Sequence, residues 1–510
     1  MQTNEDLGLS SLIPAILRAA AHAVATDLAS EVRSPNGKAL IDMICRLIRW
    51  SVVELEQHHA LYAARMQSWA PLLASGAAVP AGGSVRADPP AAAAGLLSGP
   101  TTMERRYFEE SAMLAAILEA QLRGNASSQD SAALAARLRG LIEGEVRFHK
   151  ALDPESAADI ASAYHGGKGN SPAEETAVLP AITSESLTSY LRRRFPEQAP
   201  TASGVQLLTG GMGKDTILFE LTGHSQFSGA LVMRKDLKVL SLDISAVHEF
   251  ALLQAVHAAG INVPQPLWAE NDPNQLGSRF IVVRRARGSV AISQDISNER
   301  TRRHFADKLA EGLAAIHGLN LQGSELFQDT AGRTLTEILK QQIAAWRAYW
   351  MKKRLEPSIK LDIAFAWLES NVPPDPGFPA TLVHGDYGFH NLIMEQGEVT
   401  AILDWEFAHM GDPAEDVNYC KQFIERYVPF EYFLERYLAR GGKPYDAARD
   451  RFFTVWRNVR NAVASIGALN AFHQETPGNI KMATAGLAYN PRFELEALRL
   501  IVGYLESSVS

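Results

Sequence analysis

Apolar residues recur at helical spacing through the first third of the chain. In residues 101–124, a capping box of Thr101 and Glu104 begins a helix, apolar side chains follow three and four positions apart, and a glycine ends it. A second apolar stripe runs through residues 134–146. Because two such stripes need partners to bury them, we predict an all-α bundle within residues 1–165.

Two stretches of small and turn-forming residues interrupt this helical region. Residues 75–100 are rich in Pro, Gly and Ala, and residues 166–182 combine Gly, Pro and polar residues. Such segments have few apolar side chains to bury, so we expect a loop at the first and a linker at the second. This linker separates an N-terminal helical domain of unknown role, residues 1–165, from the rest of the chain.

After the linker, short segments predict β-strands joined by a glycine-rich turn. The sequence "VQLLTGGMGKDTILFEL" indicates strand, turn and strand, and "ALVMRKD" indicates a third strand. Gly210, Gly211 and Gly213 would let backbone N–H groups approach a polyphosphate, because no Cβ is in the way. Glycines between strands more often only form a turn, so this signal is weak by itself. The pattern is not a P-loop, because Lys214 is followed by Asp215 where Ser or Thr is required.

A cation and an acid follow at positions that suit a nucleotide site. Because alternate residues of a strand face opposite sides of a sheet, Arg234 and Lys235 point apart and only one can face the glycine-rich turn. The next predicted helix carries Glu249 in its first turns. An acid from this helix that fixes one of the two basic side chains would position a cation against nucleotide phosphates. The plain alternative is a surface ion pair worth under roughly 1 kcal/mol.

A predicted hairpin brings three polar side chains to one edge. The segments "NLIM" and "TAILD" are expected to pair around a turn at residues 396–398. Asn391 and Asp404 lie almost equally far from that turn and therefore meet at its open end, while Asp386 lies in the loop just before. An amide and a carboxylate offer hard oxygens to Mg²⁺, and a second carboxylate can orient or deprotonate a hydroxyl. The arrangement suits phosphoryl transfer, although each residue alone would more often be a cap or turn residue.

Composition and charge narrow the classes of function. A chain of 510 residues with 46% apolar and 21% charged residues has the make-up of a globular protein with two or three cores. Its formal charge of −8 argues against nucleic-acid and anionic-membrane partners. The first residues lack a secretory pattern, no apolar run reaches membrane-spanning length, and Cys45 and Cys420 are far apart in sequence. We therefore expect a cytoplasmic protein without a disulfide framework.

The two polar motifs resemble those of the aminoglycoside phosphotransferase and choline kinase-type family, which has a protein-kinase-like fold. "HGDYGFHN" is similar to its H-G-D-x-x-x-x-N catalytic loop, and "ILDWEFAHMGDPAEDV" is similar to its metal-binding segment. The resemblance implies that Asp386 is the catalytic base and that Asn391 and Asp404 hold Mg²⁺ beside ATP. It further implies that Arg234 replaces the usual nucleotide-binding lysine, with Glu249 as its partner. His384 would brace the catalytic loop.

The resemblance also implies an α+β fold of two lobes. It places a small antiparallel β lobe at residues 183–287 and a mostly helical lobe at residues 288–510, after the N-terminal helical domain. The hinge between the lobes would meet adenine through backbone groups near Val283 and Arg285. Further expectations are a packing role for His317, and either loop stabilisation or simple turn and cap roles for Asp412 and Asp416.

The acceptor is the least determined part of this interpretation. The chain is most similar to the branch related to the kinase domain fused to certain acyl-CoA dehydrogenases, which favours a hydroxyacyl-CoA or a small hydroxy acid. The aromatic and basic stretch from Trp346 to Arg354 suits such an acceptor, but Trp346 and Trp350 can equally be core residues. Two alternatives remain open, an aminoglycoside phosphotransferase and a degraded kinase fold that serves as an interaction module. The expected partner is a small-molecule hydroxyl substrate, with a homodimer left open.

Overall fold

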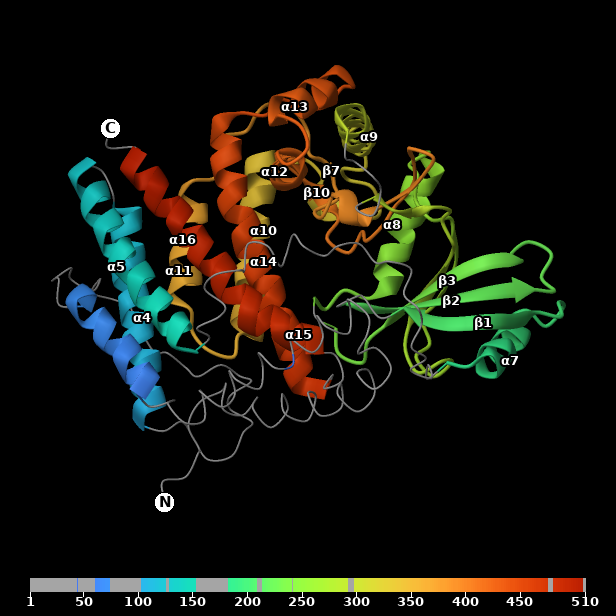
Figure 1. Ribbon diagram of the computed structural model, residues 1–510, viewed down its shortest axis with the longest axis horizontal. Helices are drawn as coiled ribbons and strands as arrows, with labels where there is room; N and C mark the ends of the chain where they lie inside the picture. The colour runs from blue at the N-terminus through green and yellow to red at the C-terminus, as the bar shows by residue number, and fades with distance from the viewer. Residues whose placement is uncertain are drawn as a thin grey trace. The chain divides into compact units, whose positions relative to one another are not determined.

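The structure is a computed structural model of the 510-residue chain (Figure 1). It describes residue 44 and residues 60–73, 102–124, 128–152, 182–208, 213–240, 242–291, 298–475 and 480–507. The expectations for Thr101, Cys45, the loop at 75–100, Gly210 and Gly211, and nearly all of the linker at 166–182 lie outside these residues. By their contacts, residues fall into two compact units, the first made of residues 1–164, 340–373 and 454–510 and the second of residues 165–339 and 374–453.

A five-stranded antiparallel sheet forms one part of the second unit. Its strands, in the order β1-β2-β3-β5-β4, are β1 (Thr201–Leu208), β2 (Lys214–Thr222), β3 (Gly229–Asp236), β5 (Phe280–Arg284) and β4 (Pro266–Glu270). Helix α7 (Ser184–Arg194) packs on β1, and helix α8 (Ala246–Ala258) packs on β3, β4 and β5 (Figure 1). The three strands predicted around the glycine-rich turn are therefore confirmed.

The side-chain alternation of β2 and β3 decides which residues face each helix. Ile217, Phe219 and Met233 are buried in the core that the sheet shares with α7. The intervening positions face the opposite side, where Val283 of β5 packs with Leu252 of α8. Because the period of a strand is two, charged residues of β2 and β3 at these intervening positions also face the α8 side.

Short sheets and helices complete the second unit. The helices are α9 (Glu299–His317), α12 (Ala414–Ile424) and α13 (Phe430–Ala439), and the strands are β6 (Ser289–Val290), β7 (Thr381–Val383), β8 (Leu392–Glu395), β9 (Glu398–Ile402) and β10 (His409–Gly411). Strands β8 and β9 form the predicted hairpin, with φ of 53° at Gln396 and 86° at Gly397. Positive φ at both turn residues matches the right-handed twist of the strands, which explains the tight connection. Antiparallel sheets and helices together confirm the α+β class.

The first unit consists of helices. Besides the helix at residues 60–73, it contains α4 (Thr102–Arg123), α5 (Ser128–Leu152), α11 (Ile359–Ser370), α15 (Ile480–Thr484), a π-helical turn (Ala485–Tyr489), α16 (Asn490–Ser507) and most of α10 (Leu335–Lys353) and α14 (Ala447–Glu475). The two predicted N-terminal helices are confirmed as α4 and α5. Trp350 of α10 is fully buried and stacks on Phe365, which makes it a core residue.

The contacts of α4 and α5 divide the chain differently from the sequence boundaries. Helix α4 packs on α11, and α5 packs on α16. The apolar stripes of the N-terminal helices are thus covered by helices that the sequence places in a separate C-terminal lobe. Two stripes alone enclose little volume, so partners from the end of the chain complete the core. That residues 1–165 fold as a domain by themselves stays a prediction.

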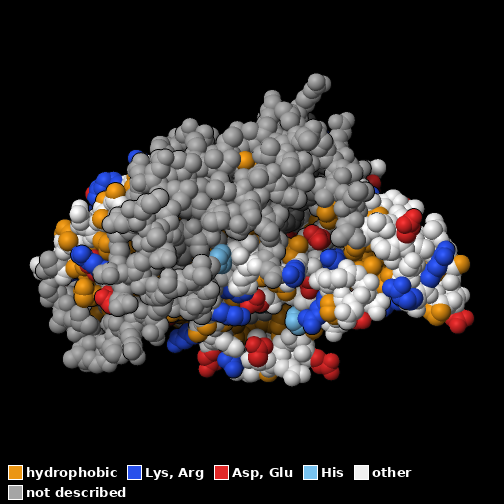
Figure 2. Space-filling view, turned by 90° about the horizontal axis from the view of Figure 1, so that it is seen from below, with side chains coloured by type: hydrophobic (Ala, Val, Ile, Leu, Met, Phe, Trp, Pro, Cys, Tyr) orange, Lys and Arg blue, Asp and Glu red, His pale blue; other side chains and the backbone are white. Residues whose placement is uncertain are grey.

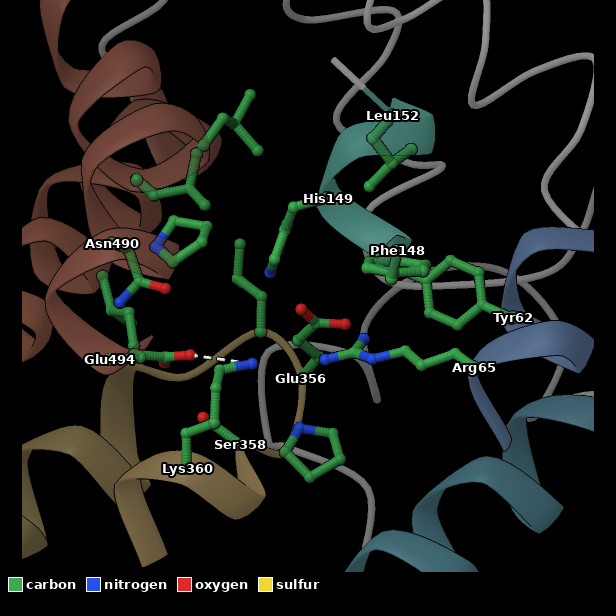
Figure 3. Close-up of a pocket in the computed structure, with 17 residues that line it drawn as sticks. Tyr62, Arg65, Phe148, His149, Leu152, Glu356, Ser358, Lys360, Asn490 and Glu494 are labelled. Carbon is green, nitrogen blue, oxygen red and sulfur yellow. Dashed lines mark ion pairs between the residues drawn. The ribbon is translucent and has the colours of Figure 1, made fainter. Parts of the chain in front are cut away.

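A buried network of charged side chains joins these helices. Arg65 forms two hydrogen bonds of 2.8 Å with Glu145 of α5 and donates another of 2.7 Å to the Tyr107 hydroxyl. Lys360 of α11 lies 2.5 Å from Glu145 Oε2 and 3.1 Å from Glu494 Oε2 of α16. A cavity of about 70 Å³ lies beside this network (Figure 3). We call these five residues the ionic cluster.

The part of one face that Figure 2 colours by residue type carries both signs of charge. On the face drawn in Figure 2, side chains of Lys and Arg are interspersed with those of Asp and Glu wherever the residues are coloured by type. Among the residues that the structure describes, no helix combines the length and the apolar character needed to cross a membrane.

Candidate active site

The loop between β7 and β8 carries Asp386 and is held in place by Asp416. The Asp416 carboxylate accepts backbone hydrogen bonds from His384 (2.7 Å) and Gly385 (2.8 Å), and it lies 3.1 Å from Nε2 of His317. Burial acts to raise the pKa of Asp416, but the hydrogen bonds and His317 outweigh it, and the pKa is lowered overall. An ionised carboxylate in the first turn of α12 therefore ties two consecutive N–H groups of the loop to the helix.

Asp412 has a different role from Asp416. Its Oδ1 accepts from the backbone N–H of Ala414, at the start of α12, and its Oδ2 accepts from Nε of Arg449 at 2.9 Å. Of the two alternatives left open by the sequence, Asp416 fits loop stabilisation, and Asp412 fits a turn residue with an added ion pair. His317 is buried and contacts Asp416 and Tyr437, as expected of a packing residue.

His384 connects the loop to the end of the hairpin. Its Nδ1 accepts from the backbone N–H of Asp386 at 3.2 Å, so the proton must be on Nε2, which donates to the Leu403 carbonyl at 3.0 Å. Burial lowers the pKa of His384, which favours this neutral tautomer. The bracing contact implied by the resemblance is thus present in the structure.

The three polar residues predicted at the open end of the hairpin do meet there. The Asn391 amide nitrogen donates to the backbone oxygen and to Oδ2 of Asp386, both at 2.9 Å. The backbone N–H of Leu403 donates to the Asn391 carbonyl at 2.8 Å, which places Asp404 beside this pair. Asp404 itself has φ of 64°, an uncommon conformation for a residue with a side chain, and such strain often occurs at functional sites.

Two cationic side chains of the sheet form ion pairs with acids beside the site. Nη2 of Arg234 in β3 lies 2.9 Å from Oδ1 of Asp404. Nζ of Lys214, the first residue of β2, lies 2.8 Å from Glu406 and 3.5 Å from Glu249. Burial acts to lower the pKa of Lys214, but these two carboxylates raise it overall, so the lysine stays charged.

Glu249 makes its closest contacts with groups other than Arg234, although, against the effect of burial, its charge joins that of Asp404 in raising the pKa of Arg234. Helix α8 directs Glu249 towards the backbone N–H of Trp405, from which Oε1 accepts at 3.0 Å, while Oε2 faces Lys214. Arg234 instead pairs with Asp404. The sequence interpretation missed Lys214 because it weighed this residue only against the P-loop pattern. Lys214 lies two residues before Thr216, and Thr216 pairs with Arg234, so both cations are on one face; this register is known only from the structure.

The other residues predicted to bind the cofactor, Gly213, Val283 and Arg285, already contact neighbouring parts of the protein. Gly213 packs closely against Glu406, since a Cβ built on it would lie 3.0 Å from the carboxylate. Val283 lies inside β5, and the backbone N–H of Arg285 already donates to the Ala230 carbonyl at 3.0 Å. An adenine contact at Val283 and Arg285 therefore stays a prediction, and the Arg285 N–H could serve it only by giving up this bond.

The donor set fits a magnesium ion. The Asn391 amide nitrogen points to Asp386, which leaves its oxygen as the atom that a cation would meet. The Asp404 side chain keeps 32% of its surface exposed. One or two protein oxygens are the usual contribution to a Mg²⁺ that keeps several waters and binds nucleotide phosphates. In the described part of the chain, no cluster of three or more His, Cys, Asp or Glu residues offers a rival metal site.

Asp386 has a second neighbour that the sequence interpretation did not single out. Nε2 of His390 lies 3.3 Å from Oδ1 of Asp386. Burial acts to lower the pKa of His390, but the Asp386 carboxylate outweighs it, and the pKa is raised overall. Both oxygens of Asp386 are thus oriented, one by an amide and the other by an imidazole.

The part of the chain that holds these residues is similar to known proteins. The phosphotransferase enzyme family matches residues 204–453. Acyl-CoA dehydrogenase family member 11 of Gallus gallus is 28% identical over 246 residues, which are 47% of this chain and 30% of that protein. Family member 10 of Mus musculus is 26% identical over 264 residues, or 50% of this chain and 23% of that protein. The chain thus spans less than a third of the length of these two relatives.

A solved structure adds a weaker likeness. The putative aminoglycoside phosphotransferase of Ralstonia eutropha JMP134 is 19% identical, covers 62% of this chain and 98% of its own, and superposes with a TM-score of 0.48. The matched family interval contains all of the sheet except the first residues of β1, and it contains the loop with Asp386 and the hairpin with Asn391 and Asp404. By the family match alone, residues 204–453 of this chain are assigned to a domain of the phosphotransferase enzyme family.

Proposed function

We propose that this protein transfers the terminal phosphoryl group of ATP, with Mg²⁺, to the hydroxyl of a small metabolite. The observation that carries the proposal is the gathering of Asp386, Asn391 and Asp404 at one hairpin end, with Arg234 bonded to Asp404. Such a site supplies a proton acceptor, oxygen ligands and a cation, which are the parts that phosphoryl transfer needs.

The residues divide the chemistry among them. Asp386 would accept the proton of the attacking hydroxyl, because its carboxylate is held by Asn391 and His390 at the edge of the site. Asp416 and His384 hold the loop, so the carboxylate is preorganised before a substrate binds. Asn391 and Asp404 would hold Mg²⁺, which when bound neutralises phosphate charge. Arg234 would contact phosphate oxygens in the planar, bidentate manner of a guanidinium.

We propose a hydroxyacyl-CoA or a small hydroxy acid as the acceptor. The support is the similarity to acyl-CoA dehydrogenase family members 10 and 11, whose names point to acyl thioesters. The stretch from Trp346 to Arg354 gives less support than its sequence suggested, because Trp350 is a core residue. Trp346 also lies near another aromatic ring, that of Trp456.

Substrate turnover tests this proposal directly. Purified protein would be incubated with Mg²⁺ and ATP against hydroxyacyl-CoAs, hydroxy acids, choline and aminoglycosides, and ADP release would be followed. Asp386→Ala and Asp404→Ala are expected to abolish turnover and to keep the native circular dichroism spectrum. Glu395→Ala, an exposed acid on the same hairpin, is the matched control and should retain wild-type rates.

Two alternatives make different predictions in the same experiments. An aminoglycoside phosphotransferase would turn over only the antibiotics and raise drug tolerance on expression. An interaction module would bind nucleotide without transfer to any hydroxyl of the panel. The filled and connected positions of Asp386, Asn391 and Asp404 favour an enzyme over the second alternative.

A further inference from the structure

Lys214 and Arg234 occupy the same face of the sheet beside the proposed phosphate site. Thr216 pairs with Arg234 across β2 and β3, and Lys214 lies two residues before Thr216. Both cations therefore face α8 and the Asp404 segment. Lys235 has the opposite orientation, and its Nζ lies 3.9 Å from Asp215.

Lys214 is also the first residue after the glycine-rich turn. Its side chain is 1% exposed, and its Nζ lies between Glu406 and Glu249 at 2.8 Å and 3.5 Å. Gly213 packs against the same Glu406 carboxylate. The end of the turn, the lysine and the segment that follows Asp404 are thus in direct contact.

Each cation is paired with an acid of the segment that contains the proposed metal ligand. Arg234 pairs with Asp404, and Lys214 pairs with Glu406. A Mg²⁺ ion on Asp404 would compete with Arg234 for one carboxylate, and phosphates would then offer both cations new anionic partners. The flexible four-carbon stem of a lysine allows such an exchange with little backbone movement.

We propose that Lys214 is a second phosphate-binding cation of this site and that its ion pairs with Glu249 and Glu406 position it before a nucleotide binds. This inference rests on the proposed function, because it assumes that a nucleotide binds here. It assigns to Lys214 the acidic partner from α8 that the sequence interpretation gave to Arg234. The competing explanation is a purely structural one, in which Lys214 only links α8 to residues 404–406.

The affinities for ligands with three, two, one and no phosphate groups distinguish the two explanations. ATP, ADP, AMP and adenosine would be titrated calorimetrically, with Mg²⁺, into wild type, Lys214→Gln and Lys235→Gln. A charge-assisted contact to phosphate predicts that Lys214→Gln weakens ATP binding about 10- to 100-fold and leaves adenosine binding unchanged. Lys235→Gln should bind all four ligands like wild type, and Lys214→Arg should recover most of the ATP affinity.

Other results would overturn the inference. An equal loss of affinity for ATP and adenosine would show that Lys214 only supports the structure, and wild-type ATP affinity in Lys214→Gln would remove it from the site. Wild-type protein that binds none of the four ligands would refute the proposed function itself, which is a distinguishable outcome.

A measurement on the wild-type protein avoids the risk that a variant fails to fold. An acyl phosphate of ATP transfers its acyl group to a lysine amine near the phosphates, forming an amide and releasing ATP. We expect peptide mass spectrometry to find the label on Lys214 and not on Lys235, and excess ATP to prevent it. Labelling of other lysines with Lys214 unmodified would contradict the inference.

Discussion

Replacing Lys360 by methionine should destabilise the helical unit through the ionic cluster. The lysine side chain is 4% exposed, and it lies between Glu145 and Glu494, which are 2% and 5% exposed. Methionine has a similar length but no charge, so the change removes the ion pairs and adds little strain. It tests whether the buried carboxylates depend on this cation.

The structure indicates how large the effect should be. Glu145 keeps two hydrogen bonds to Arg65 in the variant, so its charge remains compensated. Glu494 forms its ion pair with Lys360, and a buried carboxylate that loses its partner costs about 3–5 kcal/mol. We expect a loss near the lower end, about 3 kcal/mol, because only one carboxylate is left without its cation.

Urea unfolding, followed by circular dichroism and tryptophan fluorescence, would measure this loss. The matched control is Arg106→Met, which breaks an exposed pair with Glu110 one turn away and should cost at most about 0.5 kcal/mol. The double variant Lys360→Met/Glu494→Gln should regain a large part of the loss, since it leaves no bare carboxylate. A Lys360→Met protein as stable as the control would refute the buried ionic cluster.

Three further outcomes follow from the structure. Asp386→Ala and Asp404→Ala should each lower turnover to background while the protein stays folded, and turnover near the wild-type rate would refute their roles. Asp416→Asn should lower kcat more than it lowers nucleotide affinity, because it weakens the hydrogen bonds to the loop backbone and leaves Asp404 unchanged. Steady-state kinetics would measure kcat, and calorimetry would measure the affinity. Burial and the nearby Glu119 raise the pKa of Asp362 to about 7 from an ordinary value near 3.8, so the folded state binds the extra proton. Its contribution to stability should fall as the pH rises from about 4 to about 7, and Asp362→Asn should flatten that dependence in unfolding measurements at several pH values.

Local sequence patterns predicted several helices and strands of this fold. The apolar stripes predicted α4 and α5, and the turn-forming residues at 396–398 predicted the hairpin. The hairpin in turn predicted that Asn391 and Asp404 lie close together. These features depend on residues a few positions apart, because helix period, strand period and turn chemistry are set by neighbouring residues. For the same reason the sequence alone places the motif around Asp386 at the hairpin.

Tertiary structure decided which charged residues pair and which helices pack on α4 and α5. That Glu249 lies closest to Lys214 depends on how α8 packs on the sheet, and the contacts of α4 with α11 join residues over 200 positions apart. Many acids and bases in this sequence could pair equally well by charge alone. Sequence by itself determined the elements and the chemical groups they carry, whereas the choice of partner required packing in three dimensions, because ion pairing and burial depend on distance in space and not along the chain.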